Sequence, residues 1–275
     1  MKILNENDSN EYLLKQFETN QPFCVGRMGI VELNCLFWKI SKKQVPPYLS
    51  GLLSNNAGVY GECFEEWKEI YSEAVGNCDI NVCWQDEANK IQSQVVLSTL
   101  SPNSIKIANR AVEPFYFDNP WSQKLANKNV LVVSPFADTI NKQYEHRDKI
   151  WRNQLVLPEF NLITYANVQS IGSSGPDGSW IYSLSRMKKD ISRIDFDYAI
   201  LGCGAYGMPL VSYITKTLGK TAIYIGGGIQ ILFGIKGKRW DNHDEIKLMY
   251  NEYWTRPSFE ETPNKAMTVE NACYW

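Results

Sequence analysis

Short apolar runs alternate with longer stretches of helical character along the second half of the chain. Residues 129–134, 161–166, 197–202 and 221–225 are mostly apolar, as expected of strands that are buried on both faces. Residues 138–151, 180–191 and 208–218 lie between or after these runs and read as helices. Strands separated by helices of this length predict parallel pairing through right-handed crossovers.

The first half alternates in the same way, with a weaker pattern. Strands are predicted at residues 23–27, 80–84 and 104–108, and helices at residues 30–40, 62–75 and 87–100. No internal repeat, low-complexity segment or linker interrupts the chain, so one α/β domain over residues 1–275 is predicted. The polar and aromatic stretch from about residue 236 reads as a C-terminal extension that either covers a site or wraps the sheet.

Composition narrows the class of protein. The 275 residues include 28 Lys and Arg against 30 Asp and Glu, so no basic surface for nucleic acid is expected. No apolar run approaches the roughly 20 residues of a membrane span, and the N-terminus does not resemble a signal peptide. Seven cysteines without a C-x-x-C pair predict reduced thiols and a cytoplasmic location, with the inner membrane face as the other option. The chain has only two histidines, which argues against a His-rich zinc site.

The strongest motif is a glycine turn between the predicted strand 197–202 and the helix that follows. Gly202, Gly204 and Gly207 match the G-x-G-x-x-G dinucleotide fingerprint, in which a tight turn and a helix N-terminus receive a phosphate. That fingerprint also needs an acidic residue at the end of the next strand, where residues 224–226 are Tyr, Ile and Gly. NAD is therefore not expected, and a tight turn without a ligand is the alternative.

A second glycine cluster ends the next predicted strand. Gly226 and Gly227 stop the strand 221–225, and ligands of open α/β sheets bind outside the carboxyl ends of strands. Lys236 and Arg239 follow shortly afterwards and could neutralise a diphosphate. A solvated basic turn is the alternative interpretation of these two cations.

Near the N-terminus, Arg27, Gly29 and Glu32 run from a predicted strand into a helix. An arginine and a carboxylate beside a glycine turn offer one cation for a phosphate and one group for a metal or a proton. A surface pair between Arg27 and Glu32 is the alternative.

The loop at residues 172–178 also follows a predicted strand and opens a helix. It is not a G-x-S-x-G nucleophile elbow. Asp177 is a candidate to bind a sugar hydroxyl or to act as a base, and a plain helix cap by Asp177 or Ser179 is the alternative.

Two of these segments resemble one protein family. Residues 23–33, FCVGRMGIVEL, resemble the R-F-G-D-G-E-L segment that opens bacterial glycosyltransferases of the GT-D fold. Residues 201–226, with their glycine turn, helix and strand ending in I-G, resemble the C-terminal unit of that family. The two segments cover about a quarter of the chain and occur in the same order.

The resemblance implies a Rossmann-like, mostly parallel sheet with helices on both faces. It also implies transfer of a sugar from a nucleotide sugar, usually a UDP-sugar, to a glycan or glycolipid acceptor in cell-surface polysaccharide assembly. Arg27, Gly29 and Glu32 match the family motif, but the family's metal-associated Asp falls on Ile30. Glu32 would then hold Mg²⁺ or Mn²⁺ alone with the diphosphate, or cationic residues would replace the metal.

The role of the base stays open between Glu32 and Asp177, and a homo-oligomer is compatible with the sequence.

A non-catalytic module that binds nucleotide sugars is the second hypothesis, supported by Ile30 in place of the family's Asp. An NAD-dependent oxidoreductase is the third, and the absent acidic residue after Tyr224 argues against it.

Overall fold

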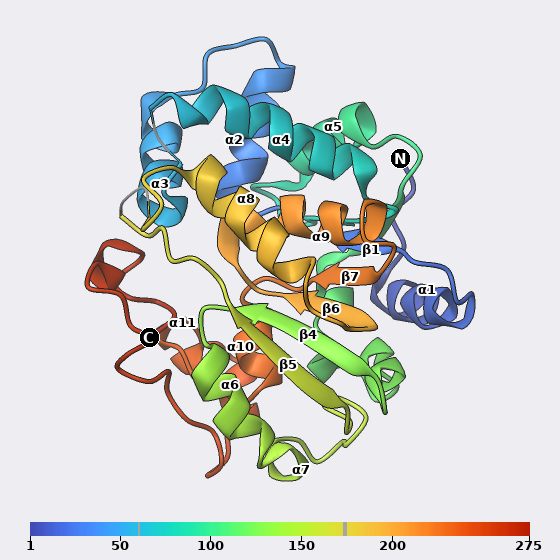
Figure 1. Cartoon of the computed structure of the whole chain (residues 1–275). Helices are drawn as coiled ribbons and strands as arrows, with labels where there is room; N and C mark the ends of the chain where they lie inside the picture. Colours follow the sequence, from blue (N-terminus) through green and yellow to red (C-terminus); the bar gives the residue numbers. More distant parts are fainter. Residues whose placement is uncertain (60, 173–174) are drawn as a thin grey trace.

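The protein is built around one parallel sheet (Figure 1). A computed structural model describes residues 1–59, 61–172 and 175–275, and within them the sheet has seven strands in the order β3-β2-β1-β7-β6-β4-β5. Every strand pair is parallel. The strands are β1 (Cys24–Gly26), β2 (Ile80–Cys83), β3 (Ile105–Ala108), β4 (Asn129–Ser134), β5 (Asn161–Ala166), β6 (Tyr198–Leu201) and β7 (Thr221–Tyr224). All seven strands expected from the sequence are confirmed, as is the Rossmann-like α/β class.

Helices cover both faces of the sheet, because right-handed crossovers in opposite directions place their helices on opposite faces. One face carries α2 (Ile30–Ile40), α4 (Cys63–Asn77), α5 (Lys90–Leu100), α8 (Trp180–Ile191) and α9 (Gly207–Lys216). The other carries α1 (Glu6–Glu18), α6 (Ala137–Tyr144), α7 (Arg147–Ile150) and α10 (Gly228–Leu232). Two further helices, α3 (Pro47–Ala57) and α11 (Lys238–Asp241), complete the set in the described residues.

The apolar residues form two cores, one on each side of the sheet. Alternate residues of β4 show the division, because Leu131 and Val133 belong to one cluster and Val130 and Val132 to the other. All four are fully buried. This explains why the central strands read as continuous apolar runs: each residue of such a strand meets a layer of helices.

Several helical features differ from the sequence-based expectation. The helix predicted over residues 138–151 is divided into α6 and α7. Near the end of α6, the Gln143 side chain donates to the carbonyl oxygens of Gly234 (3.0 Å) and Tyr253 (3.0 Å). Helices α1, α3, α10 and α11 were not predicted. Asn5 caps α1, and α3 runs from Pro47 to a left-handed Gly58.

The two halves of the sequence interlock at the middle of the sheet, where β1 pairs with β2 on one side and with β7 on the other. The C-terminal stretch after residue 236 packs onto the second core through Trp240, Trp254 and Trp275. In the described part of the chain, no helix is both long and apolar enough to cross a membrane.

Gly207 offers a test of this packing. A Cβ added there would lie 2.4 Å from the Tyr224 ring, so Gly207→Ala should lower the free energy of unfolding by about 1–3 kcal/mol through overpacking. Gly51→Ala is the matched control, because Gly51 lies in α3 with open space around its Cβ position and should gain about 0.5–1 kcal/mol. Urea denaturation measures both changes. Equal stabilities for the two variants would contradict the packing described here.

Candidate functional site

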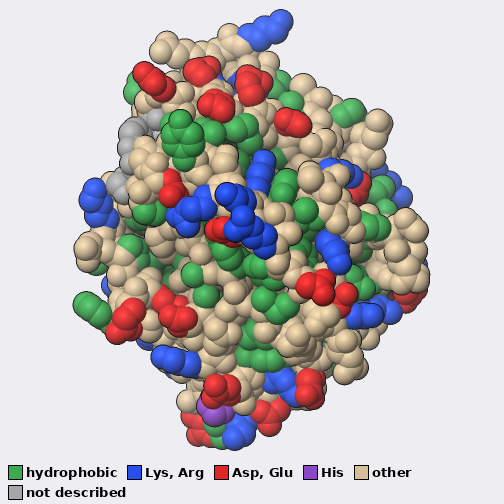
Figure 2. Space-filling model, in the orientation of Figure 1, with side chains coloured by type: hydrophobic (Ala, Val, Ile, Leu, Met, Phe, Trp, Pro, Cys, Tyr) green, Lys and Arg blue, Asp and Glu red, His purple; other side chains and the backbone are tan. Residues whose placement is uncertain are grey.

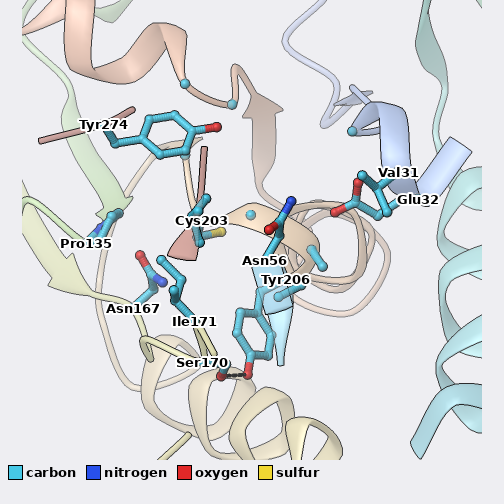
Figure 3. Close-up of a pocket in the computed structure, with 18 of the residues that line it drawn as sticks. Val31, Glu32, Asn56, Pro135, Asn167, Ser170, Ile171, Cys203, Tyr206 and Tyr274 are labelled. Atoms are coloured by element: carbon cyan, nitrogen blue, oxygen red, sulfur yellow. Dashed lines mark hydrogen bonds between the residues drawn. The ribbon is translucent and has the colours of Figure 1, made fainter. Parts of the chain in front are cut away.

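A cavity of about 290 Å³ opens at the carboxyl edge of the sheet (Figure 3). Its walls include the loops that follow β1, β4, β5, β6 and β7, the start of α2, and Trp84 after β2, while α3 and the C-terminal tail close other sides. Open parallel sheets bind their ligands at this edge, outside the strand ends. The cavity brings together most of the residues singled out from the sequence: Arg27, Gly29, Glu32, Gly202, Gly204, Gly226, Gly227 and Arg239.

The turn after β6 has a structural reason for each of its glycines. A Cβ on Gly202 would lie 2.3 Å from the Ile229 side chain and 2.6 Å from the Gly226 carbonyl oxygen. Gly204 has a φ of +57°, in the left-handed region that favours glycine. Gly207 packs under the ring of Tyr224 and does not line the cavity, while the Tyr224 hydroxyl donates to the Gly204 carbonyl oxygen at 2.7 Å. Tyr224 therefore occupies the place where a dinucleotide site would carry its acidic residue.

The turn after β7 separates two arginines. Gly226 has a φ of +65°, and a Cβ there would lie 2.6 Å from Nη1 of Arg27. On Gly227, a Cβ would lie 3.3 Å from the ring of Tyr274, against which Arg239 stacks with its guanidinium 4.5 Å from the ring centre. The glycine turn thus lets one cation approach from the β1 side and another from the tail.

Arg27 is held by protein acceptors on every side of its guanidinium. Its Nε donates to Asn109 (2.9 Å), its Nη1 donates to the Ile225 carbonyl oxygen (2.8 Å), and its Nη2 lies 3.5 Å from the Glu113 carboxylate. The guanidinium also lies 5.0 Å above the Trp84 ring. The pKa of Glu113 is raised, because the effect of burial exceeds the opposite effect of the Arg27 charge. Arg27 is therefore a fixed part of the cavity wall. The surface pair between Arg27 and Glu32 that the spacing allowed does not occur.

Glu32 lies in the first turn of α2, where the helix dipole favours a carboxylate. Its side chain folds back over Gly29, since a Cβ at Gly29 would lie 2.1 Å from a Glu32 carboxylate oxygen. Burial raises the pKa of Glu32. Burial, and after it the charge of Glu32, also raise the pKa values of Tyr71 and Tyr224. A carboxyl group with a raised pKa, facing a cavity, is suited to accept a proton from a bound hydroxyl.

The structure does not bring Asp177 to the cavity. Asp177 accepts hydrogen bonds from Ser183 (2.7 Å) and from Arg186 (2.9 Å), and Arg186, followed by Ser183, lowers its pKa. Ser179 caps α8, as one of the two alternatives proposed. Ser173 and Ser174 of the same loop lie outside the described residues. A carboxylate that is paired and made less basic in this way does not fit the role of a base in this cavity.

Lys236 also lies away from the cavity. Its ammonium group sits 5.2 Å from the ring centre of Tyr250, and its backbone N–H donates to Thr255. Of the two cations expected to face a diphosphate from the tail, only Arg239 lines the cavity.

Charged side chains elsewhere on the surface are largely engaged with neighbours. Figure 2 shows a group of Lys and Arg side chains near the middle of one face, with Asp and Glu side chains above and below it. Lys188 of α8 lies over the ring of Tyr213, and Lys216 of α9 pairs with Asp79 at 2.7 Å. These two cations therefore have partners within the protein.

The donor set of the cavity does not fit a metal held by the protein alone. Ile30, which stands where the resembling family has its Asp, is 45% exposed and lines the cavity without an oxygen to offer. The described residues contain no group of three or more His, Cys, Asp or Glu side chains that could hold an ion. Two arginines line the same space. The cations that the described residues offer to an anion in the cavity are therefore arginines.

Several cavity residues were not singled out from the sequence. The loop after β5 contributes Asn167, Gln169 and Ser170, and the tail contributes Glu270 and Tyr274. Ser170 and Tyr206 share a hydrogen bond of 2.5 Å at the cavity's edge (Figure 3). The first three could have been found from the sequence, because they directly follow the predicted strand 161–166 and ligands bind outside the carboxyl ends of such strands. The tail gave only its aromatic composition, which left open whether it covers a site or wraps the sheet; it does both.

Comparisons with family models, with curated proteins and with solved structures give no match for this chain. The assignment of function therefore depends on the geometry of the cavity and on the resemblance of the two sequence segments.

The Glu32 carboxyl, whose pKa is raised by partial burial, predicts a pH-dependent stability. A group whose pKa is raised on folding binds more protons in the folded chain, so the free energy of unfolding falls as pH rises above the ordinary glutamate value of about 4.3. Glu32→Gln removes this titration, and its melting temperature relative to wild type should rise between pH 4 and pH 8. Thermal unfolding monitored by circular dichroism measures the difference.

Glu66→Gln, at an exposed position of α4, controls for the loss of one negative charge. A difference for Glu32→Gln that stays constant with pH, or shrinks, would show that the carboxyl is not destabilised by folding.

Proposed function

We propose that this protein is a glycosyltransferase that moves a sugar from a nucleotide sugar, with a UDP-sugar as the expected donor, to a glycan or glycolipid acceptor. The observation that carries the proposal is the Glu32 carboxyl, which lies in a cavity also lined by two arginines and two glycine turns. The resemblance of residues 23–33 and 201–226 to the GT-D family supports the same assignment. The proposal includes a cytoplasmic location, at the inner membrane face where acceptors for cell-surface polysaccharide would be found.

Glycosyl transfer needs a base for the acceptor hydroxyl and stabilisation of the departing nucleoside diphosphate. Glu32 is assigned to the first task, because its raised pKa favours proton uptake and its carboxyl faces the cavity. Arg239 and Arg27 are assigned to the second, Arg239 from the tail and Arg27 from the β1 loop. Backbone N–H groups of the glycine turns can approach phosphate oxygens closely because no Cβ intervenes.

A non-catalytic module that binds nucleotide sugars is the second candidate. It needs the same phosphate contacts as the transferase but no base and no metal. Ile30 favours it. An NAD-dependent oxidoreductase has less support, since Tyr224 bonds to Gly204 where a ribose-binding carboxylate would stand.

The transferase proposal predicts a division between binding and turnover. Glu32→Gln should reduce transfer by at least about 100-fold, the usual contribution of a positioned base, while binding of UDP or a UDP-sugar changes little. Transfer is measured by release of UDP in the presence of an acceptor panel, and binding by titration calorimetry. Asp177→Asn is the matched control, with the same carboxyl-to-amide change outside the cavity, and should keep most of the activity.

Full transfer by Glu32→Gln would remove Glu32 from the role of base. Binding of nucleotide sugars by the wild type without turnover on any acceptor would favour the binding module. Selective binding of NADH would favour the oxidoreductase.

A further inference from the structure

Residues 269–275, named here the strap, form one wall of the cavity. Val269, Glu270, Tyr274 and Trp275 line it, and Figure 3 shows the Tyr274 side chain extending over the same space as Cys203 and Asn167. The strap belongs to the C-terminal extension, so this wall is built by chain that follows the last strand of the sheet.

Arg239 fastens the strap to the rest of the protein. Its Nη2 donates to the Glu270 carboxylate at 2.5 Å, and its Nη1 donates to the Tyr274 hydroxyl at 2.9 Å. Its backbone N–H donates to the Cys273 carbonyl oxygen at 2.9 Å. The Glu270 carboxylate is thus an anion of the protein itself that pairs with a cation of the cavity. Both side chains remain partly exposed, at 36% for Arg239 and 58% for Glu270.

The closed strap is held in an unfavourable backbone conformation. Glu270, Asn271 and Ala272 have φ values of +45°, +55° and +59°. None of the three is a glycine, and each left-handed residue costs free energy unless its surroundings fix it. The contacts of Arg239 with the strap are part of what fixes it.

An unpaired polar atom lies under the strap. The Gln230 side-chain amide donates to the Tyr274 carbonyl oxygen at 2.6 Å, while its oxygen Oε1 is buried and accepts no hydrogen bond from any described residue. Gln230 is 1% exposed. A buried acceptor without a donor is a further cost of the closed arrangement.

The two arginines of the cavity differ in how readily they can change partners. Arg27 is fixed by Asn109, by the Ile225 carbonyl oxygen and by Glu113, which lie on the segments that follow β3 and β7. Arg239 has its carboxylate partner on the strained strap. A phosphate that enters the cavity would therefore displace the partners of Arg239 at a smaller free-energy cost than the partners of Arg27.

We propose that the strap is an autoinhibitory latch in which Glu270 competes with the phosphate groups of the ligand for Arg239. This inference rests on the proposed function, which supplies a phosphate-bearing donor. In the ligand-free protein Glu270 holds Arg239 and the strap is closed. When a diphosphate takes Arg239, Glu270 is released, the left-handed turn relaxes and the cavity opens towards Gln230.

The first test is calorimetric titration of the full chain with inorganic pyrophosphate and with UDP. Glu270→Gln should bind both about two- to fivefold more tightly than wild type, because an exposed ion pair is worth no more than about 1 kcal/mol. Arg239→Gln should bind more weakly. The double variant Glu270→Gln, Arg239→Gln should bind as weakly as Arg239→Gln, since Glu270 acts only through Arg239.

Glu252→Gln, another exposed glutamate of the tail, is the control for charge and should bind like wild type. A gain that persists in the double variant, or equal pyrophosphate affinity of Glu270→Gln and wild type, would overturn the latch. So would a failure of both proteins to bind pyrophosphate. Tighter pyrophosphate binding by Glu270→Gln, with no binding of UDP or UDP-sugars, would support the latch and count against the proposed donor.

Hydrogen exchange provides a readout of the motion itself. The backbone N–H groups of Arg239, Cys273 and Trp275 donate to carbonyl oxygens in the closed strap. Saturating pyrophosphate should increase their exchange in the wild type, and Glu270→Gln should increase it without ligand. Unchanged or slower exchange in both cases would show that the strap stays closed over the ligand, and the latch would be wrong.

Discussion

The architecture of the site depends on the close approach of two backbone turns at the carboxyl edge of the sheet. The turn after β6 and the turn after β7 pack so tightly that a Cβ on Gly202 would lie 2.6 Å from the carbonyl oxygen of Gly226. This contact removes side chains from the middle of the edge and lets Arg27 and the tail reach it from opposite sides. The cavity is the space that remains between these walls. Its glycines are thus required by packing before any ligand is considered.

The fold could be predicted well from the sequence because a doubly covered parallel sheet imposes a simple pattern. Strands such as β4 face helices on both sides, so their residues are apolar in succession. Elements at the margin of the fold carry less of this pattern. Helix α1 buries Ser9 and Asn10 together with its leucines. Helix α3 begins with Pro47, directly after another proline, and contains Gly51 and paired asparagines. Their helical conformation depends on caps and on tertiary contacts that a periodicity does not reveal.

The same reasoning accounts for what could be predicted of the site. Residues that directly follow strands, such as Arg27 and Gly226, are brought to one edge by the parallel topology, so strand positions alone bring them together. Asp177 and Lys236 were chosen for charge and proximity to glycines, and their side chains instead meet Arg186 and Tyr250. Sequence distance gave no indication of these partners. Glu270 and Tyr274 were missed because the tail reaches the edge through contacts of the folded chain, with no strand to place it.

The largely buried pair of Arg27 and Glu113 shows why the site is a property of the whole chain. Removing two charges from water is costly, and a buried ion pair is weak evidence for stability. This pair nevertheless joins the segment after β3 to the loop after β1, while Arg27 also holds the Ile225 carbonyl oxygen after β7. Residues 27, 113 and 225 meet only when β1 has paired with both β2 and β7. The wall of the cavity is therefore complete only after both halves of the sequence have joined the sheet, and the arginine retains one orientation because three distant segments fix it.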